Sequence, residues 1–215
     1  MSVYGNSASR QARVIRAGAR KGARRRVTAW MGVNAEAKAA DAVAARWELG
    51  ARAEKATARL VRPLWWRGWR IRHDRRLAGR RFNVDHVLVS PCGTAVVVAD
   101  TKRWHARRTT TVVGGRLCCG EDRHEEAEKA ARYAALVGQA LAAPGVPQVA
   151  VWPVLVVHGS TVLGGHVQVA TVHGMVQVVA ADQARRVLRA APQGWSWQRG
   201  RRVARRVDQV LRPYR

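Results

Sequence analysis

Two aspartates and a lysine interrupt an otherwise apolar stretch of the sequence between Asn83 and Trp104. Asp85 and Asp100 supply carboxylates, the kind of oxygen ligand that Mg²⁺ takes at distances of about 2.0–2.1 Å. Lys102 follows two residues after the second aspartate, where its ammonium group can meet a phosphate or a metal-bound water. The alternative is that these charges simply end two strands and reach solvent. The residue types alone leave both interpretations open.

The residues around these charges predict a β-hairpin. Residues 84–89 and 94–99 are apolar runs rich in β-branched side chains, and the Ser-Pro-Cys-Gly sequence at 90–93 is a turn signal. Both runs are apolar on both faces, which is typical of strands covered on both sides in a layered α/β core.

A loop at residues 90–93 fixes the expected geometry of the hairpin. In that register Asp85 lies opposite Val98. Asp100 lies opposite Asn83. Because side chains alternate along a strand, Asp85, Asp100 and Lys102 then share one face. The two aspartates become diagonal neighbours about 7–8 Å apart. A loop of odd length would place them on opposite faces and destroy the site.

Residues 34–62 predict a helix, with Asn34 as its N-cap. Glu54 lies in the apolar stripe of this helix rather than on its polar face. A carboxylate buried there needs a partner, which is either a cation or a core arginine in a salt bridge. Gly50 and Ala58, one turn to either side, are expected to let the helix approach the sheet closely. The stripe consists of Ala42, Val43, Trp47, Gly50, Glu54, Thr57 and Val61.

The composition gives the chain a large positive charge. Its 215 residues include 39 Lys and Arg against 14 Asp and Glu, a formal net charge of +25. A field of this size favours polyanions, so nucleic acid is the first candidate partner and an acidic membrane surface the second. The residues expected to contact nucleic acid are Arg24, Arg25, Arg26, Arg103, Arg107, Arg108, Arg201 and Arg202.

Both ends of the chain are basic. Residues 1–33 form an acid-free arm whose arginines have helical spacing between residues 10 and 20, so that it either folds on phosphate or stays a solvated tail. Residues 191–215 predict a basic amphipathic helix that docks on the core, binds DNA or lies on a membrane. In the Trp- and Arg-rich segment 65–72, alternating side chains either stack on bases and hold phosphates or pack a domain edge.

Two further features bear on the cellular setting. The longest fully apolar piece, residues 149–157, is too short to span a membrane, so no stable membrane insertion is expected. The three cysteines, Cys92, Cys118 and Cys119, are odd in number and lack a CxxC spacing, which favours a reduced, cytoplasmic setting.

The ordered set of acidic residues resembles the nuclease-related domain (NERD) family, a branch of the PD-(D/E)XK nuclease superfamily. The likeness covers about residues 46–181. It is carried by Asp85, the Asp-Thr-Lys sequence at 100–102, the Arg-Trp pair that follows, and Glu54 four residues after Gly50. Asp100 stands at a position where the wider superfamily more often has glutamate. The change shortens the side chain and keeps its charge.

The resemblance implies an α/β fold with a restriction-endonuclease-like core, in which a mixed central sheet is flanked by helices. This core would occupy residues 34–190, between a basic N-terminal arm at 1–33 and a basic C-terminal tail or helix at 191–215. On the helix expected at 125–143, Tyr133 and Gln139 are candidates for the polar residue that several branches place near the site.

The resemblance also implies the roles of the site residues. Asp85, Asp100 and the backbone carbonyl of Thr101 would hold Mg²⁺ or Mn²⁺, with Glu54 acting directly or through water. Lys102 would orient or deprotonate a water molecule, or neutralise the phosphate.

Three classes of function compete for this sequence. The favoured one is a metal-dependent nuclease that hydrolyses phosphodiester bonds in DNA, with RNA as the other substrate. The second is a nucleic-acid-binding protein on a nuclease scaffold that no longer cuts, and the third is a peripheral membrane or protein-interaction module. The intact acid set favours the enzyme, because a pure binder gains nothing from carboxylates that face phosphate. The mode of cleavage and the oligomeric state are left open.

Overall fold

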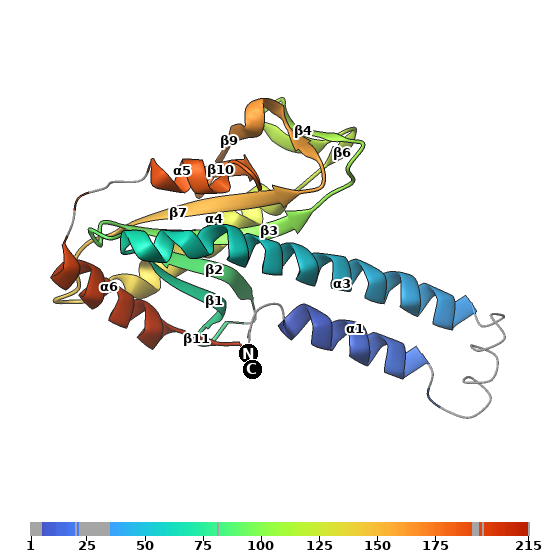
Figure 1. Cartoon of the computed structure of the whole chain (residues 1–215), viewed down its shortest axis with the longest axis horizontal. Coiled ribbons are helices and arrows are strands. Elements are labelled where there is room, and N and C mark those ends of the chain that lie inside the picture. Colours follow the sequence, from blue (N-terminus) through green and yellow to red (C-terminus); the bar gives the residue numbers. More distant parts are fainter. Residues whose placement is uncertain are drawn as a thin grey trace.

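The computed structural model describes residues 6–19, 21, 35–80, 82–190, 194 and 196–214. The basic residues Arg24, Arg25 and Arg26 and the expected N-cap Asn34 lie outside these ranges. The described helices and strands form an α/β fold in which a seven-stranded sheet lies between helices (Figure 1).

The central sheet is mixed, with the strand order β11-β1-β2-β3-β7-β10-β9. The strands β3, β7 and β10 run parallel to one another, while the other neighbours are antiparallel. This confirms the predicted fold class and is consistent with restriction-endonuclease-like architecture. The strands are β1 (Arg70–Leu77), β2 (Asn83–Val89), β3 (Ala95–Arg103), β7 (Ala150–His158), β9 (His166–Thr171), β10 (Gly174–Ala180) and β11 (Leu211–Pro213).

Helices cover both faces of this sheet because its strands are apolar on both sides. One face packs against the C-terminal half of α3 (Ala35–Val61), the 3-10 turn Arg62–Arg67 and α5 (Ala184–Arg189). The other packs against α4 (Glu126–Leu141) and α6 (Trp197–Val210).

A second, four-stranded sheet follows the site strand β3. It has the order β6-β5-β4-β8 and packs with α4 and β9–β10 over a third apolar cluster. Its elements are β4 (Thr109–Val113), β5 (Arg116–Cys119), β6 (Asp122–Arg123) and β8 (Thr161–Val162), which is followed by the 3-10 turn Leu163–Gly165. The three cysteines lie in the hairpin turn and in β5, where all are buried and none forms a disulfide.

The N-terminal half of α3 does not pack on the sheet, contrary to the expected stripe. It extends beyond the sheet beside α1 (Asn6–Ala19), as Figure 1 shows. Ala37, Ala44 and Ala51, seven residues apart, are buried, whereas Val43 and Trp47 are exposed. The alanines form the packing stripe because small side chains at this spacing let two helices come close.

Polar contacts join the two helices as well. Arg16 of α1 forms ion pairs with Asp41 and Glu48 of α3. The expected close approach at Gly50 was wrong, since a Cβ there would meet no atom within 4 Å. Ala58, by contrast, is buried as expected.

The predicted hairpin is present, but its register differs by two residues. Ser90 continues the ladder, because its N–H donates to the Ala95 carbonyl at 2.9 Å and its hydroxyl accepts the Ala95 N–H at 3.1 Å. The loop is therefore residues 91–94, and Val89 lies opposite Val96. Continuing this register places Asp85 level with Asp100 rather than diagonal to it. The shift is even, so both aspartates stay on one face.

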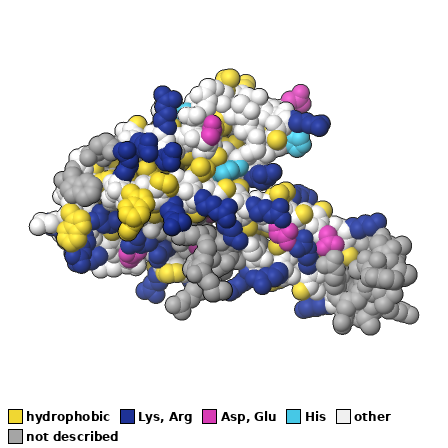
Figure 2. Space-filling model, in the orientation of Figure 1, with side chains coloured by type: hydrophobic (Ala, Val, Ile, Leu, Met, Phe, Trp, Pro, Cys, Tyr) yellow, Lys and Arg dark blue, Asp and Glu magenta, His cyan; other side chains and the backbone are white. Residues whose placement is uncertain are grey.

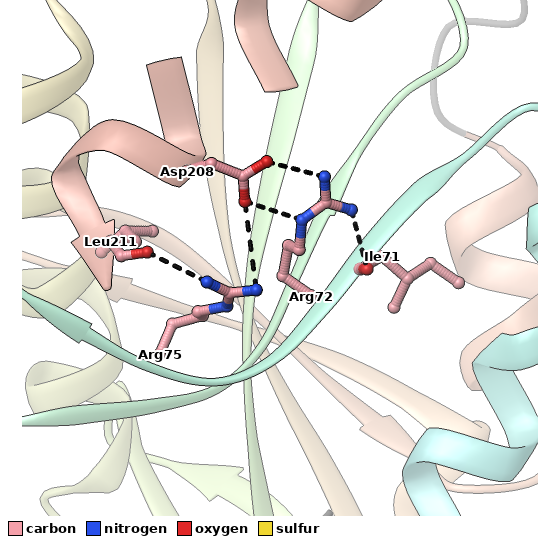
Figure 3. A network of polar contacts seen from close by, with 5 residues as sticks. All are labelled: Ile71, Arg72, Arg75, Asp208 and Leu211. Atoms are coloured by element: carbon pink, nitrogen blue, oxygen red, sulfur yellow. Dashed lines mark hydrogen bonds and ion pairs between the residues drawn. The ribbon is translucent and has the colours of Figure 1, made fainter. Parts of the chain in front are cut away.

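The C-terminal helix is predicted correctly and docks on the core through Val203, Ala204 and Val207. After it, β11 pairs with β1, an interaction that the sequence does not predict. Figure 3 shows how Asp208 of α6 receives two hydrogen bonds from the Arg72 guanidinium, at 2.7 and 2.8 Å. The Arg75 guanidinium lies 4.0 Å from the same carboxylate. These contacts fasten α6 to the edge of the sheet.

We expect Asp208→Asn to lower the free energy of unfolding by about 1 kcal/mol at pH 7, because a bidentate but half-exposed ion pair is lost. The hydrogen bonds and charge of Arg72 hold the pKa of Asp208 below its ordinary value. Its contribution is therefore complete above the ordinary aspartate pKa and is lost as the pH falls through the lower folded value. Urea unfolding at several pH values measures this difference.

Asp122→Asn is the matched control, because its partner Arg108 lies on an exposed surface and joins no distant elements. Equal destabilisation by the two variants would contradict the role assigned to Asp208.

Candidate active site

The hairpin opens at its free end, and Asp85 bridges the opening. The last backbone pair joins His86 to Ala99. Beyond it, the Asp85 carboxylate accepts the backbone N–H of Thr101 at 2.8 Å, in place of a carbonyl of β2. In a strand the N–H and C=O of one residue face the same neighbour. The Thr101 carbonyl therefore also faces the opening beside Asp85.

Asp100 and Lys102, on β3, lie on the same face of the sheet as Asp85 of β2. The Lys102 ammonium forms an ion pair with the Asp100 carboxylate at 2.6 Å, and both side chains are partly exposed. Burial lowers the pKa of Lys102, but the charge and hydrogen bond of Asp100 outweigh it and leave the pKa raised. Lys102 is therefore an ammonium ion near neutral pH.

Glu54 approaches these groups from α3. Burial, followed by repulsion from Asp74 and Asp100, raises its pKa to about 7. The charge of Lys102 acts in the opposite direction. Glu54 is thus within electrostatic reach of Asp100 and Lys102, although α3 packs on the other face of the sheet.

The pKa values of the two aspartates are raised as well. Burial, followed by the charges of Asp100 and Glu54, raises the pKa of Asp85 well above its usual range. Burial also raises the pKa of Asp100, although Lys102 opposes the shift. Three half-buried carboxyl groups thus lie within electrostatic reach of one ammonium group. Such a cluster favours the entry of a further cation or of a proton.

Two acidic neighbours were missed by the sequence analysis. Asp74 of β1 is buried, and the pairs on either side of it place it level with Asp85. Its φ of +47° is unusual for a residue with a side chain. Glu126 begins α4, lies 3.3 Å from His124, and raises the pKa of both Asp100 and Lys102. Two sequence signals could have identified them, an acidic residue within a basic strand and a glutamate at the start of a helix.

Tyr133 and Gln139 were expected to place a polar side chain of α4 near the site, but both lie elsewhere on this helix. Tyr133 stacks on Phe82 with ring centroids 4.1 Å apart. Gln139 is exposed in the last turn, beside Gly138, which packs against Val151 near the start of β7. Glu126 occupies the end of the helix that faces the acids.

The donor set fits Mg²⁺ better than a metal held entirely by side chains. Within the described ranges, no group of three or more His, Cys, Asp or Glu side chains is placed to hold a metal ion. Mg²⁺ commonly takes one or two carboxylates together with waters and substrate phosphates. Asp85, Asp100 and the Thr101 carbonyl form such a partial set.

A chain of hydrogen bonds crosses the opposite face of the same strands. His73 Nδ1 lies 2.7 Å from His86 Nδ1, and His86 Nε2 lies 3.2 Å from the Thr101 hydroxyl. The Thr101 hydroxyl donates to Thr57 at 3.1 Å, and the Thr57 hydroxyl lies 2.8 Å from His158 Nε2. Each of these groups can act as donor in one bond and acceptor in the next if every bond is donated in the same direction, from His73 to His158.

The three histidines of this hydrogen-bond chain are neutral. Burial lowers the pKa of His73 to about 4 and that of His86 well below its ordinary value, and it lowers the pKa of His158. Thr57 lies one helical turn after Glu54. The chain therefore ties the helix that carries Glu54 to Thr101, whose backbone N–H holds Asp85.

The expected nucleic-acid contacts differ in their surroundings. Arg103 and Arg107 are exposed at and just beyond the end of β3. Arg108 is also exposed but forms an ion pair with Asp122, which offsets its charge. Arg201 and Arg202 are exposed on α6.

A cavity of about 650 Å³ lies apart from the expected catalytic residues. It is lined by residues of β5, of the start of α4 and of the β9–β10 turn, and by none of the four expected catalytic residues. Arg116, Arg123 and Arg132 make its lining basic.

In the described part of the chain, no helix has the length and apolar character needed to cross a membrane.

We expect Thr57→Val to lower the free energy of unfolding by about 1–3 kcal/mol, because the Thr101 hydroxyl and His158 Nε2 each lose a buried partner. Thr57→Ser keeps the hydroxyl and should retain most of the stability. Urea unfolding compares them. A valine variant as stable as the serine variant would show that the chain is not bonded as described.

Comparison with known proteins gives a match to a family model. No curated protein and no solved structure matches the chain. The family model of the nuclease-related domain, NERD, matches residues 49–158. That range begins in α3, contains all four residues around the open hairpin, and ends with β7. The chain therefore belongs to the nuclease-related domain family.

Proposed function

We propose that this protein is a metal-dependent nuclease that hydrolyses phosphodiester bonds in DNA. The observation that carries the proposal is the placement of Asp85, Asp100 and Lys102 at the open end of the hairpin, with Glu54 within electrostatic reach of Asp100 and Lys102. Membership of a nuclease-related family supports it. So does the net charge of +25, because a polyanionic substrate is attracted to such a chain.

The residues divide the work between binding and chemistry. Asp85, Asp100 and the Thr101 carbonyl would hold Mg²⁺ or Mn²⁺, with Glu54 contributing directly or through water. When bound, the ion would act as a Lewis acid that lowers the pKa of a water molecule and stabilises charge developing on the phosphate. The hydrogen bond from Thr101 fixes one Asp85 oxygen, which orients the carboxylate before substrate arrives.

Lys102 and Glu54 suit the two remaining tasks. The raised pKa of Lys102 favours a positive charge that neutralises the phosphate over the alternative of deprotonating water. Burial, with repulsion from Asp74 and Asp100, raises the pKa of Glu54 to about 7, so Glu54 is suited to release its proton and join the other acids when a divalent cation enters.

One observation favours a second function, binding of nucleic acid without cleavage. Asp85 is already bonded to Thr101, and Asp100 is already paired with Lys102, so these two acids have partners within the protein. Under this alternative the acids stabilise the open hairpin, and the basic surface alone provides affinity.

We predict that Asp100→Asn abolishes cleavage of supercoiled DNA in Mg²⁺ and leaves DNA affinity equal or tighter. The variant loses a metal ligand worth several kcal/mol to the reaction, while a negative charge that repels phosphate disappears. Cleavage, affinity and melting temperature should be measured on the same preparations, with EDTA as a further control.

Asp122→Asn, an exposed acid outside the site, is the matched variant and should cut like wild type. No cleavage by either wild type or Asp100→Asn, with similar affinities, would support the binding-only alternative. Wild-type cleavage that survives EDTA, or a mutant that cuts as well as wild type, would refute the mechanism.

Binding of duplex DNA should depend steeply on salt. Each neutralised phosphate contributes about −0.9 to the slope of log K against log salt. Replacing Arg103 and Arg107 with Gln should therefore make the slope shallower by up to about 1.8 units. Arg185 and Arg186, exposed on α5, serve as the control pair. If both double variants change the slope equally, the binding surface does not surround the open hairpin.

A further inference from the structure

Three exposed tryptophans gather at the end of the sheet that lies away from the acids. Trp65 and Trp66, in the turn after α3, are 61% and 81% exposed, and Trp197, the first residue of α6, is 54% exposed. In Figure 2, yellow hydrophobic side chains lie among dark-blue Lys and Arg side chains where α3 ends and α6 begins. Large apolar side chains exposed together commonly mark a binding surface.

Two of these side chains, Trp65 and Trp197, line a cavity. The cavity, of about 300 Å³, is lined by Trp65, Gly68, Trp69, Arg70, Pro91 and Trp197. Trp69 is buried and provides its base. Its size lies at the lower end of the range for small-molecule pockets, which suits one planar group rather than a folded domain.

Two arginines, Arg70 and Arg201, lie at the cavity, and neither forms an ion pair with an acid of the described residues. Arg70 is partly buried in its wall, and Gly200 leaves room for its guanidinium, because a Cβ there would lie 2.6 Å from Nη1. Arg201 lies over the Trp197 ring, 4.9 Å from the centroid. No ion pair joins Arg62, Arg67, Arg70 or Arg201 to an acid of the described chain.

The cavity is separate from the acidic site. It adjoins Pro91 in the hairpin turn, whereas Asp85 lies at the open end of the same hairpin. Six residues of extended chain separate them, a distance of about 20 Å. A strand of nucleic acid several nucleotides long can span the two places.

We propose that this cavity binds an unstacked base of single-stranded nucleic acid, with Trp65 and Trp197 stacking on the base and the arginines holding the flanking phosphates. Aromatic walls combined with unpaired arginines are the features that single-strand-binding surfaces use. A duplex keeps its bases stacked and inaccessible, so it cannot fill the cavity. A proline-rich peptide also binds aromatic grooves, but it offers no negative charge to these arginines.

The inference deepens the proposed function, since it gives the nuclease a preference for substrates with single-stranded segments. Its test does not depend on cleavage. Binding of a fluorescent oligo(dT) of about 12 nucleotides, within the range of single-strand sites, and of a duplex of equal length is measured by anisotropy in EDTA.

Trp65→Ala and Trp197→Ala should each weaken oligo(dT) binding about 5- to 140-fold, the loss expected for one stacked base, and leave duplex affinity close to wild type. Trp197→Phe should restore most of the affinity. Trp47→Ala is the matched control, because Trp47 is 45% exposed on α3 but does not line the cavity.

Unchanged oligo(dT) binding by both cavity variants would overturn the inference. So would an equal loss by Trp47→Ala, an equal loss of duplex binding, or displacement of the oligonucleotide by a polyproline peptide. Unchanged melting temperatures exclude misfolding of the variants. Cleavage of supercoiled DNA in Mg²⁺ tests the proposed function independently, so failure of either proposal is recognised without the other.

Discussion

The hydrogen bond from the Thr101 N–H to Asp85 is the interaction on which the site depends. Where β2 and β3 stop pairing, a backbone N–H would lack a partner, and the carboxylate supplies it. The same contact holds the side chain beside Asp100 and Glu54, whose charges repel it. Three carboxyl groups thus lie close together at the open hairpin, and the ammonium group of Lys102 is the main positive charge that balances them within the site. Burial raises the pKa of all three carboxyl groups, and neighbouring carboxylates add to the shift.

The surrounding fold keeps that arrangement rigid. The parallel pairing of β3 with β7 extends as far as Arg103 and His158, so the strand that carries Asp100 and Lys102 is supported to its end. Gly159 follows with φ +88°, and a Cβ there would lie 2.2 Å from the Trp104 carbonyl, so only glycine lets the two strand ends meet this closely. On the far face, Thr57 couples α3 to the same strand.

Much of this arrangement could be predicted from local sequence. Alternation along two apolar strands placed the aspartates and the lysine on one face, and helical periodicity placed Glu54 toward the sheet. The loop was assigned one residue too early because the Ser90 hydroxyl imitates a turn residue while actually closing the ladder. Asp74 was missed because only the pairing of β1 with β2 brings it near. The pairing of β11 with β1 joins residues about 136 positions apart, as Arg75 and Leu211 illustrate, and no local pattern encodes it.

A crystal structure of the protein grown with Mn²⁺ tests the central claim most directly. The account predicts an anomalous scattering peak within coordination distance of Asp85, Asp100 and the Thr101 carbonyl, with the Asp100–Lys102 ion pair lengthened. A peak at another place, or no peak while Asp100 remains paired with Lys102, would contradict it.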